Sequence, residues 1–416
     1  MSELRTRDVV ESDLPAVLSI RARSFGPLGA GGEQWWQRVS GETLGGRMLA
    51  VVDESDTVVG AGRIRPFEQA WGGRHLRMGG VAGVYVEPSA RGRGVATTLT
   101  RALVRRMGEL GDVVSCLFPT TPTLYRRTGY EVGGVQTRTT YAGHLLRALG
   151  TSRGTAQVAR GDGLRPARPE DAQRLHDQAR EAGSRHGLSG PMVQSVATVR
   201  GALERNELIA YVVDGGHVVY DLSEHALTVE ELVATTPEAA ATLWGVVGSG
   251  SSAVPTVHTY LDPRDPVALV LGGLPETDVR QVPWMGRVID LEAAWHGRGF
   301  NPHLSVEVDL VVSDAEAPRN SGRWTLAVSG GSGTATRTDG TPLRGDGDTR
   351  LSPDIASTGP ADGEVLRVEA RGLSALWCGW SVSRLRQAGL ASGGTRDADA
   401  ALDAAFAAQP FITEYF

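Results

Sequence analysis

The 416-residue sequence contains no lysine, so all 42 of its basic residues are arginines. This absence excludes three chemistries that depend on a lysine side chain: Schiff-base catalysis, attachment of pyridoxal phosphate and a Walker-type phosphate loop. Cysteine is scarce as well. With only Cys116 and Cys378, neither a disulfide framework nor a cysteine-based zinc site is expected. None of the nine histidines has metal-ligand spacing, so no metal is expected either.

Long apolar runs are also missing. No segment approaches the roughly 20 apolar residues of a membrane-spanning helix, and the first ten residues, MSELRTRDVV, lack the apolar core of a signal peptide. These features predict a cytoplasmic protein without a membrane span. The net charge of −6 argues against nucleic acid as the main partner. A length of 416 residues exceeds one typical hydrophobic core and predicts two or three domains.

The most informative stretch is a glycine-rich loop between an expected strand and an expected helix. A valine-rich run, Gly79–Val86, precedes Arg91-Gly92-Arg93-Gly94, and apolar residues then recur at helical spacing from Val95 to Met107. Amide groups in the first turn of a helix have no intrahelical acceptor, and glycines let the backbone approach a ligand, so this order suits a pyrophosphate. An ordinary strand–helix turn with solvated arginines is the alternative interpretation.

These residues resemble a known family. The run R-G-R-G-V-A after V-x-V-x-P is similar to the acetyl-CoA loop of the GNAT N-acetyltransferases, and it does not have the spacing of the Rossmann fingerprint. The resemblance implies acetyl-CoA as co-substrate, with backbone amides of Val84 and Val86 binding the pantetheine arm and the acetyl carbonyl. The cofactor-binding residues that it implies are Val84, Tyr85, Val86, Arg91, Gly92, Arg93, Gly94, Val95, Ala96, Thr97, Thr120 and Thr121.

A second run, from Leu124 to Tyr130, also resembles the GNAT pattern, in which a helix ends in a Tyr-x-x-x-Gly-Tyr/Phe segment. The resemblance implies that Tyr125 protonates the leaving thiolate of CoA. A tyrosine with its ordinary pKa of ~10 is protonated at neutral pH and can act in this way. The alternative is that Tyr125 only packs on the sheet and that Tyr130 starts the next strand. We prefer this structural role for Tyr130 and the catalytic role for Tyr125.

The sequence contains a weak internal repeat. Leu164-Arg165, followed by Glu170-Asp171, echoes Leu4-Arg5, followed by Ser12-Asp13, and predicts a second copy of the same fold after a linker over residues 142–163. The glycines of this copy, Gly245, Gly248 and Gly250, lie at the end of an expected helix rather than at its start. We therefore expect that the second copy does not bind CoA.

The whole chain resembles the "enhanced intracellular survival" (Eis) acetyltransferases of actinobacteria. Matching features include Asp262-Pro263-x-Asp265-Pro266, an Arg-Gly-Phe ending at Phe300, and a terminal aromatic residue. The resemblance implies an α+β protein with two tandem GNAT-type α/β domains, the second degenerate, and a sterol-carrier-protein-like domain. The expected ranges are 1–150, 151–285 and 286–416. It also implies a homohexamer, a trimer of dimers, that acetylates amines including aminoglycosides.

In this family the general base is the C-terminal carboxylate, which the resemblance places on Phe416. The large apolar residues at the end of the chain support this role, because a terminus is usually polar and frayed; a tail that packs on its own domain is the alternative. The expected substrate-binding residues are Phe25, Trp35, Trp36, Glu414 and Tyr415. Where some members of the family carry acids, this chain has Gly26-Pro27 and Tyr415, which predicts a weaker attraction for polycations.

Two functional hypotheses follow. The first is an acetyl-CoA-dependent N-acetyltransferase that acts by direct transfer on primary amines of a polyamine-like, aminoglycoside-like or lysine-containing substrate, small molecule or protein. The second is a non-catalytic protein that binds CoA or an apolar ligand. Binding of acetyl-CoA with or without release of free thiol distinguishes them.

Overall fold

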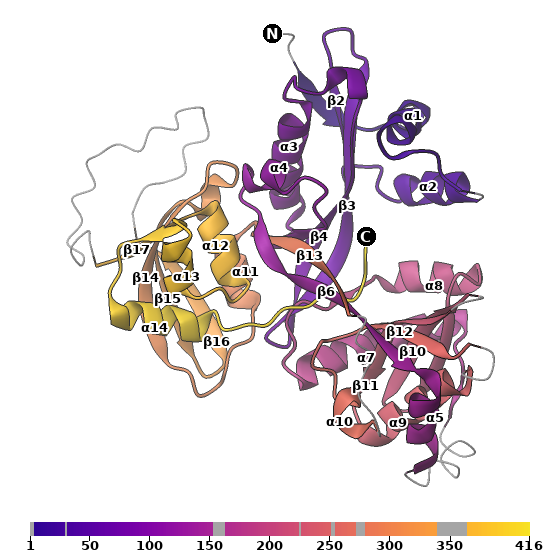
Figure 1. The fold of residues 1–416 in the computed structure, drawn as a ribbon. Helices are drawn as coiled ribbons and strands as arrows, with labels where there is room; N and C mark the ends of the chain where they lie inside the picture. Colours follow the sequence, from indigo (N-terminus) through magenta and orange to yellow (C-terminus); the bar gives the residue numbers. More distant parts are fainter. Residues whose placement is uncertain are drawn as a thin grey trace, which may run out of the picture.

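The computed structural model describes residues 4–29, 31–152, 163–223, 226–250, 254–271, 279–338 and 364–416. Figure 1 shows three parts. The first two form the two halves of one large sheet: an N-terminal half that begins in indigo, and a second half below it in magenta and pink. The third is a C-terminal domain in orange and yellow. The last segment of the chain leaves the C-terminal domain and runs back across the other two parts. A thirteen-stranded sheet extends through both halves, and a separate five-stranded sheet forms the C-terminal domain.

The N-terminal half contains the strand and the helix that the sequence predicted on either side of the glycine-rich loop. Its elements are β1 (Arg5–Asp8), α1 (Leu14–Phe25), α2 (Gly32–Gly41), β2 (Met48–Val52), β3 (Val58–Trp71), β4 (Arg74–Val86), α3 (Val95–Leu110), β5 (Val114–Leu117), α4 (Pro122–Arg126) and β6 (Glu131–Ala142). Helices α1 and α2 lie on one face of the sheet and α3 on the other (Figure 1). Ile64 packs with α3 residues, whereas Ala61 packs with residues of α1 and α2, as the alternation of a strand requires.

The second half repeats this order. Its elements are β7 (Arg165–Pro166), α7 (Ala172–Arg185), β8 (Met192–Val193), α8 (Val196–Glu204), β9 (Ile209–Val213), β10 (Gly216–Leu222), β11 (Leu227–Ala234), α9 (Pro237–Ser249), β12 (Thr256–Tyr260), α10 (Val267–Val270) and β13 (Arg280–Val288). Strands β11 and β12 are parallel neighbours, like β4 and β5 in the first half.

The two halves contain corresponding ion pairs. Arg7 donates to Asp13 at 2.6 and 3.0 Å, and Arg165 donates to Asp171 at 2.6 Å through each of two nitrogens, with a separation of six residues in both pairs. The predicted repeat is therefore present, but its register differs by two residues from the sequence match, because Arg165 corresponds to Arg7 rather than Arg5.

The two halves exchange their last strands. The sheet order in the middle is β5-β13-β6-β12, so β13 of the second half lies between β5 and β6, and β6 of the first half pairs with β12. Met285 is opposite Leu117 of β5, and Thr256 of β12 is opposite Ala142. The domain boundary expected at residue 286 thus falls inside β13, which completes the sheet of the first half.

This exchange predicts that the first half does not fold alone. A fragment of residues 1–152 would lack β13 and so leave β5 and β6 as unpaired edges, which promote association. We expect it to be insoluble or oligomeric, and to melt without a cooperative transition, under conditions in which the full chain melts cooperatively. Size-exclusion chromatography and thermal circular dichroism test this. A monomeric fragment with a sharp melting transition would contradict the structural role given to β13.

The linker expected over residues 142–163 is wrong for its first part. Gly143–Ser152 forms helix α5, which packs on α9, and residues 153–162 lie outside the described ranges. The approach is close at Gly248, where a Cβ atom would come within 2.6 Å of the Arg147 Cα. Gly248 thus allows two helices to pack together.

The C-terminal domain is a five-stranded sheet covered by helices. Its elements are α11 (Leu291–Gly297), β14 (Val306–Ser313), β15 (Gly322–Ser329), β16 (Ser332–Arg337), β17 (Leu366–Glu369), α12 (Ala370–Trp377), α13 (Val382–Gln387), β18 (Ala391–Ser392) and α14 (Arg396–Ala405), with strand order β16-β15-β14-β17-β18. Ion pairs hold it against the first half: Glu316 accepts from Arg101 of α3 at 2.7 Å, for example, and Arg371 donates to Glu131 of β6 at 2.7 Å.

Candidate active site

The site begins where two parallel strands separate. β4 and β5 pair only between Met78–Gly80 and Val114–Cys116, and β4 then continues to Val86 without β5 beside it. The register of β3 against β4 shifts next to Gly83, which has a φ of +59°. A bulge of this kind turns the strand and re-aims its backbone groups. The result is an open gap in the sheet, at the segment that contains Val84 and Val86.

The predicted loop closes one end of this gap. A 3₁₀ turn over Pro88–Ala90 follows β4, and helix α3 begins at Val95. Gly92 and Gly94 have φ values of +78° and +87°, and a Cβ at either position would have no neighbour within 4 Å. These glycines therefore provide a left-handed backbone and leave open space above the loop. The first amides of α3 and its positive dipole end border that space.

The C-terminal tail, residues 406–416, passes close to three glycines on its way to the N-terminal half. A Cβ at Gly379 would collide with the carbonyl of Ala408, a Cβ at Gly134 would lie 2.6 Å from the carbonyl of Pro410, and a Cβ at Gly190 would collide with the backbone of Phe411. Hydrogen bonds add to these contacts, because the Phe411 amide donates to Ser189 and Gln136 donates to the Thr413 carbonyl at 2.7 Å. The tail is bound along its length and does not end on its own domain.

The terminal residue lies where β4 and β5 diverge. The Phe416 ring packs against Phe67 with centroids 5.2 Å apart and against Phe118 at 5.7 Å. It also covers Gly80, the last β4 residue opposite β5, where a Cβ would lie 2.8 Å from the ring. Tyr415 is 63% exposed and packs on Phe118 at 4.4 Å.

Glu414 is held by an ion pair and a hydrogen bond from two other parts of the chain. Arg65 of β3 lies 3.3 Å from its carboxylate, and Gln194 of the second half donates to it at 2.9 Å. Glu414 therefore links β3, the second half and the tail.

Tyr125 lies on α4 with only 6% of its surface exposed, edge-on to Tyr130 at 6.1 Å. Burial raises the pKa of Tyr125 to about 12, and Tyr415 adds to the increase. The phenol is thus protonated over the whole neutral range. Because an ordinary thiol has a pKa of ~8.5, complete proton transfer from this phenol to a thiolate is uphill, whereas a hydrogen bond to the thiolate is favourable. Tyr130 directly precedes β6, within one residue of the expected strand start, and its hydroxyl lies 2.7 Å from Ser115 Oγ.

The remaining predicted residues separate into two groups. Phe25 is 53% exposed and edge-on to Tyr85 at 5.7 Å, and Trp35 is 46% exposed, so both are available as walls of an acceptor pocket. Trp36 is 1% exposed and packs in the core with α1, so it does not line the site. Thr120 and Thr121 are exposed between β5 and α4.

Sequence reasoning missed two arginines on β3. Arg63 and Arg65 lie on the same face of the strand as Phe67, on which the terminal ring packs. The available signal was their spacing of two residues within a predicted strand, which places both side chains on one face.

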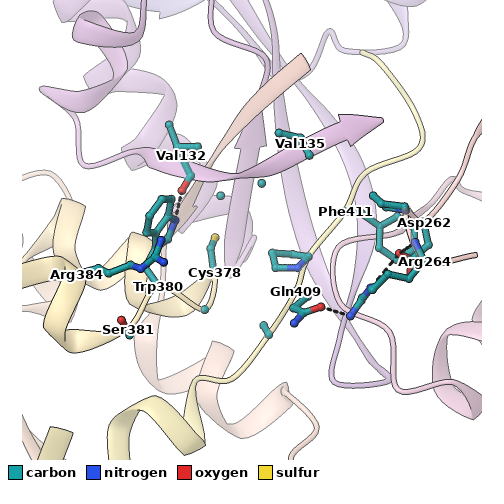
Figure 2. A pocket seen from close by; sticks show the side chains of 16 residues that line it. Val132, Val135, Asp262, Arg264, Cys378, Trp380, Ser381, Arg384, Gln409 and Phe411 are labelled. Carbon is teal, nitrogen blue, oxygen red and sulfur yellow. Dashed lines mark hydrogen bonds and ion pairs between the residues drawn. The ribbon is translucent and has the colours of Figure 1, made fainter. Parts of the chain in front are cut away.

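A cavity of about 620 Å³ lies beside the middle of the tail, away from this gap. In Figure 2, Trp380 and Arg384 are on one side of it, Gln409 and Arg264 on the other, and β6 passes above. Trp380 donates to the Val132 carbonyl at 2.8 Å. None of the predicted catalytic or cofactor-binding residues lines this cavity.

Two further observations concern metal ions and membranes. Within the described ranges, no group of three or more His, Cys, Asp or Glu side chains is placed to hold a metal ion. In the same parts of the chain, every helix is too short or too polar to cross a bilayer.

Comparisons with protein families agree with this architecture. Residues 5–133 match an acetyltransferase (GNAT) domain, residues 194–288 match a second model with the same description, and residues 291–413 match a sterol carrier protein domain. These matches confirm the predicted fold, with two GNAT domains followed by a sterol-carrier-type domain. A search of curated protein sequences gave no match.

Several solved structures share the complete fold. A GCN5-related N-acetyltransferase from Kribbella flavida is 39% identical, with a TM-score of 0.89 over 100% of this chain and 99% of that chain. A GCN5-related N-acetyltransferase from Anabaena variabilis is 20% identical with a TM-score of 0.79, and Eis1 from Mycobacterium abscessus is 19% identical with a TM-score of 0.71. Both of these comparisons cover 100% of both chains and show the shared fold.

Proposed function

This chain belongs to the GCN5-related N-acetyltransferase family and is an acyltransferase, and we propose that it transfers the acetyl group of acetyl-CoA directly to a primary amine in the gap between β4 and β5. The observation that carries this proposal is the coincidence of three features at one place. The strands diverge after Gly80, the glycine-rich loop leads into α3 at the end of β4, and the ring of Phe416 covers Gly80.

The family fold implies acetyl-CoA binding, and the gap offers the groups that this ligand needs. We assign the pyrophosphate to the loop from Arg91 to Thr97, where helix amides and two arginines provide an anion site. Backbone groups from Val84 to Val86 would bind the pantetheine arm and polarise the acetyl carbonyl. Thr120 and Thr121 border the other side of the arm in this assignment.

The reaction then needs one base and one hydrogen-bond donor. The neutral amine attacks the thioester carbonyl carbon, the carbon–sulfur bond breaks, and CoA leaves as a thiolate. The Phe416 carboxylate accepts the proton that the amine loses and returns it to water, and the protonated Tyr125 phenol stabilises the sulfur by a hydrogen bond until the thiolate takes a proton from water. Phe25 and Trp35 would form walls of the acceptor pocket, with Glu414 and Tyr415 at its edge.

Some finer expectations stay predictions. These are acceptors of the polyamine, aminoglycoside or protein-lysine class, a homohexameric assembly and a cytoplasmic location. The family resemblance suggests them.

The test of the proposed function uses two measurements on the wild-type protein. Calorimetric titration with acetyl-CoA reports binding, and release of free thiol in the presence of a broad panel of primary amines reports transfer. We expect binding and amine-dependent thiol release. Tight binding of acetyl-CoA without thiol release from any amine would favour the alternative, a CoA- or apolar-ligand-binding protein.

The loop assignment makes a separate prediction. A Gly94→Glu variant should raise the KM for acetyl-CoA at least about 10-fold above that of Gly94→Ala, because a carboxylate next to a phosphate costs several kcal/mol and each ~1.4 kcal/mol is tenfold. Gly94→Ala is the matched control, since both substitutions place a side chain at the same left-handed position. Steady-state kinetics with varied acetyl-CoA give both values. Equal KM values in the two variants would remove the loop from the cofactor site.

A further inference from the structure

Arg63 is a buried cation without an ion-pair partner among the described residues. Its side chain lies on β3, the residue is 7% exposed, and neither Nε nor Nη1 has a hydrogen-bond partner. No carboxylate in the described part of the chain lies within ion-pair distance of it. Burial lowers the pKa of Arg63, but the guanidinium remains charged at neutral pH. Buried charges are normally paired because desolvation costs several kcal/mol, so this one requires an explanation.

Its position points to the acceptor side of the gap. The adjacent Gly62 faces α3, where a Cβ would lie 3.1 Å from Leu103, so Arg63 faces the opposite side of the sheet, which α1 and α2 cover. Arg63 is opposite Ala82 of β4, directly before the bulge at Gly83. The Trp35 ring centroid lies 5.9 Å from its guanidinium carbon.

The groups around Arg63 do not neutralise its positive charge. On the same strand face, Arg65 is neutralised by Glu414. Tyr85 and Glu42 both act to raise the pKa of Arg63, but neither forms an ion pair with it. The acceptor side therefore carries one uncompensated positive charge beside the bulge.

We propose that Arg63 binds a carboxylate of the acceptor, so that the acetylated amine belongs to a molecule that also carries a carboxylate, such as an amino acid. This inference rests on the proposed function and specifies its substrate class. A guanidinium binds a carboxylate through two parallel hydrogen bonds, which would fix the orientation of the acceptor and direct its amine toward the thioester. The same positive charge disfavours polycations such as aminoglycosides, in line with the absence of acids at Gly26, Pro27 and Tyr415.

The decisive experiment compares α-amino acids with their carboxamides, which differ only in the loss of the carboxylate charge. At saturating acetyl-CoA, kcat/KM for thiol release should favour the acid over its amide by about 10- to 100-fold, the scale of a charge-assisted hydrogen-bonded pair. In Arg63→Gln this ratio should fall toward one, mainly through KM. Arg63→Lys keeps the charge without the planar fork and should give an intermediate ratio.

Three results would overturn the proposal. The wild type could prefer amides or polyamines, Arg63→Gln could leave the ratio unchanged, or acid and amide could slow equally through kcat. The last result would mean that Arg63 acts on the catalytic groups rather than on the acceptor.

A binding measurement separates this proposal from the proposed function. Calorimetric titration should show that benzoate binds the wild type at least about 10-fold more tightly than Arg63→Gln, whereas its neutral analogue benzamide should not distinguish the two proteins. If no amine releases thiol, the proposed acetyl transfer fails, and the benzoate comparison still decides whether Arg63 holds a carboxylate. Equal benzoate affinities would contradict the anion site.

Stability provides the folding control. Because Arg63 has no ion-pair partner that its replacement would leave unpaired, Arg63→Met removes an uncompensated buried charge, and its melting temperature should equal or exceed that of the wild type. A marked decrease would show that Arg63 contributes to the fold and would contradict a residue kept for its ligand.

Discussion

A C-terminal extension should reduce turnover about 10²- to 10⁴-fold, the range for loss of a general base, while acetyl-CoA still binds. Even one added residue converts the Phe416 carboxylate into an amide. The rest of the tail should stay in place, because the contacts at Gly379, Gly134 and Gly190 precede the terminus. The measurement is the rate of thiol release at saturating acetyl-CoA, with circular dichroism to confirm folding.

The matched controls separate the carboxylate from the ring. The same extension at the N-terminus should leave the rate unchanged. Phe416→Leu keeps the carboxylate but loses the aromatic packing on Phe67 and Phe118, so it should retain measurable turnover. A folded, C-terminally extended enzyme that works at the full rate would remove the terminal carboxylate from the mechanism.

Tyr125→Phe should fold normally and turn over roughly 10²-fold more slowly, the scale for loss of one hydrogen-bond donor to a developing negative charge. Since burial raises the pKa of this phenol to about 12, ionisation of Tyr125 should not reduce the rate below about pH 11. Steady-state kinetics at several pH values test both statements. Turnover at the wild-type rate would show that the Tyr125 phenol does not stabilise the charge that develops on the sulfur.

Tyr130→Phe is the control for Tyr125→Phe. It removes a buried hydroxyl whose partner is Ser115, so it should cost about 1 kcal/mol of stability and leave turnover close to wild type. A loss of turnover equal to that of Tyr125→Phe would show that the two tyrosines act as one packing unit.

The loop and the second copy could be predicted from the sequence because both have local signals. Arg91–Gly94 lies between a valine-rich strand and a helix with clear 3.6-residue spacing, and the pattern before Asp171 repeats the pattern before Asp13. Such signals depend on residues that are close in the chain. The structure therefore agrees with them to within a few residues.

The strand exchange and the path of the tail could not be predicted in this way. The pairing of β13 with β5 joins residues far apart in the chain and leaves no periodicity in either segment. Gly134, Gly190 and Gly379 are indistinguishable in the sequence from turn or strand glycines, yet each makes room for the tail backbone.

The orientation of single side chains was also beyond prediction from the sequence, as two adjacent tryptophans and one arginine show. Trp35 and Trp36 were both expected to face the acceptor, but neighbouring positions on a helix point in different directions, and Trp36 faces the core. Arg63 has no comparable signal in the sequence, because its importance lies in the absence of an ion-pair partner, which only the surrounding side chains reveal.

The most direct test of the central claim is to quantify free CoA and N-acetylated amine together in one reaction of the wild-type enzyme. A mixture of amino acids and polyamines with acetyl-CoA provides the acceptors, and mass spectrometry identifies the product. Direct transfer predicts one acetylated amine for each thiol released, with neither product formed when the acceptor is omitted. Binding of acetyl-CoA with no acetylated amine from any acceptor, or thiol release without one, would contradict it.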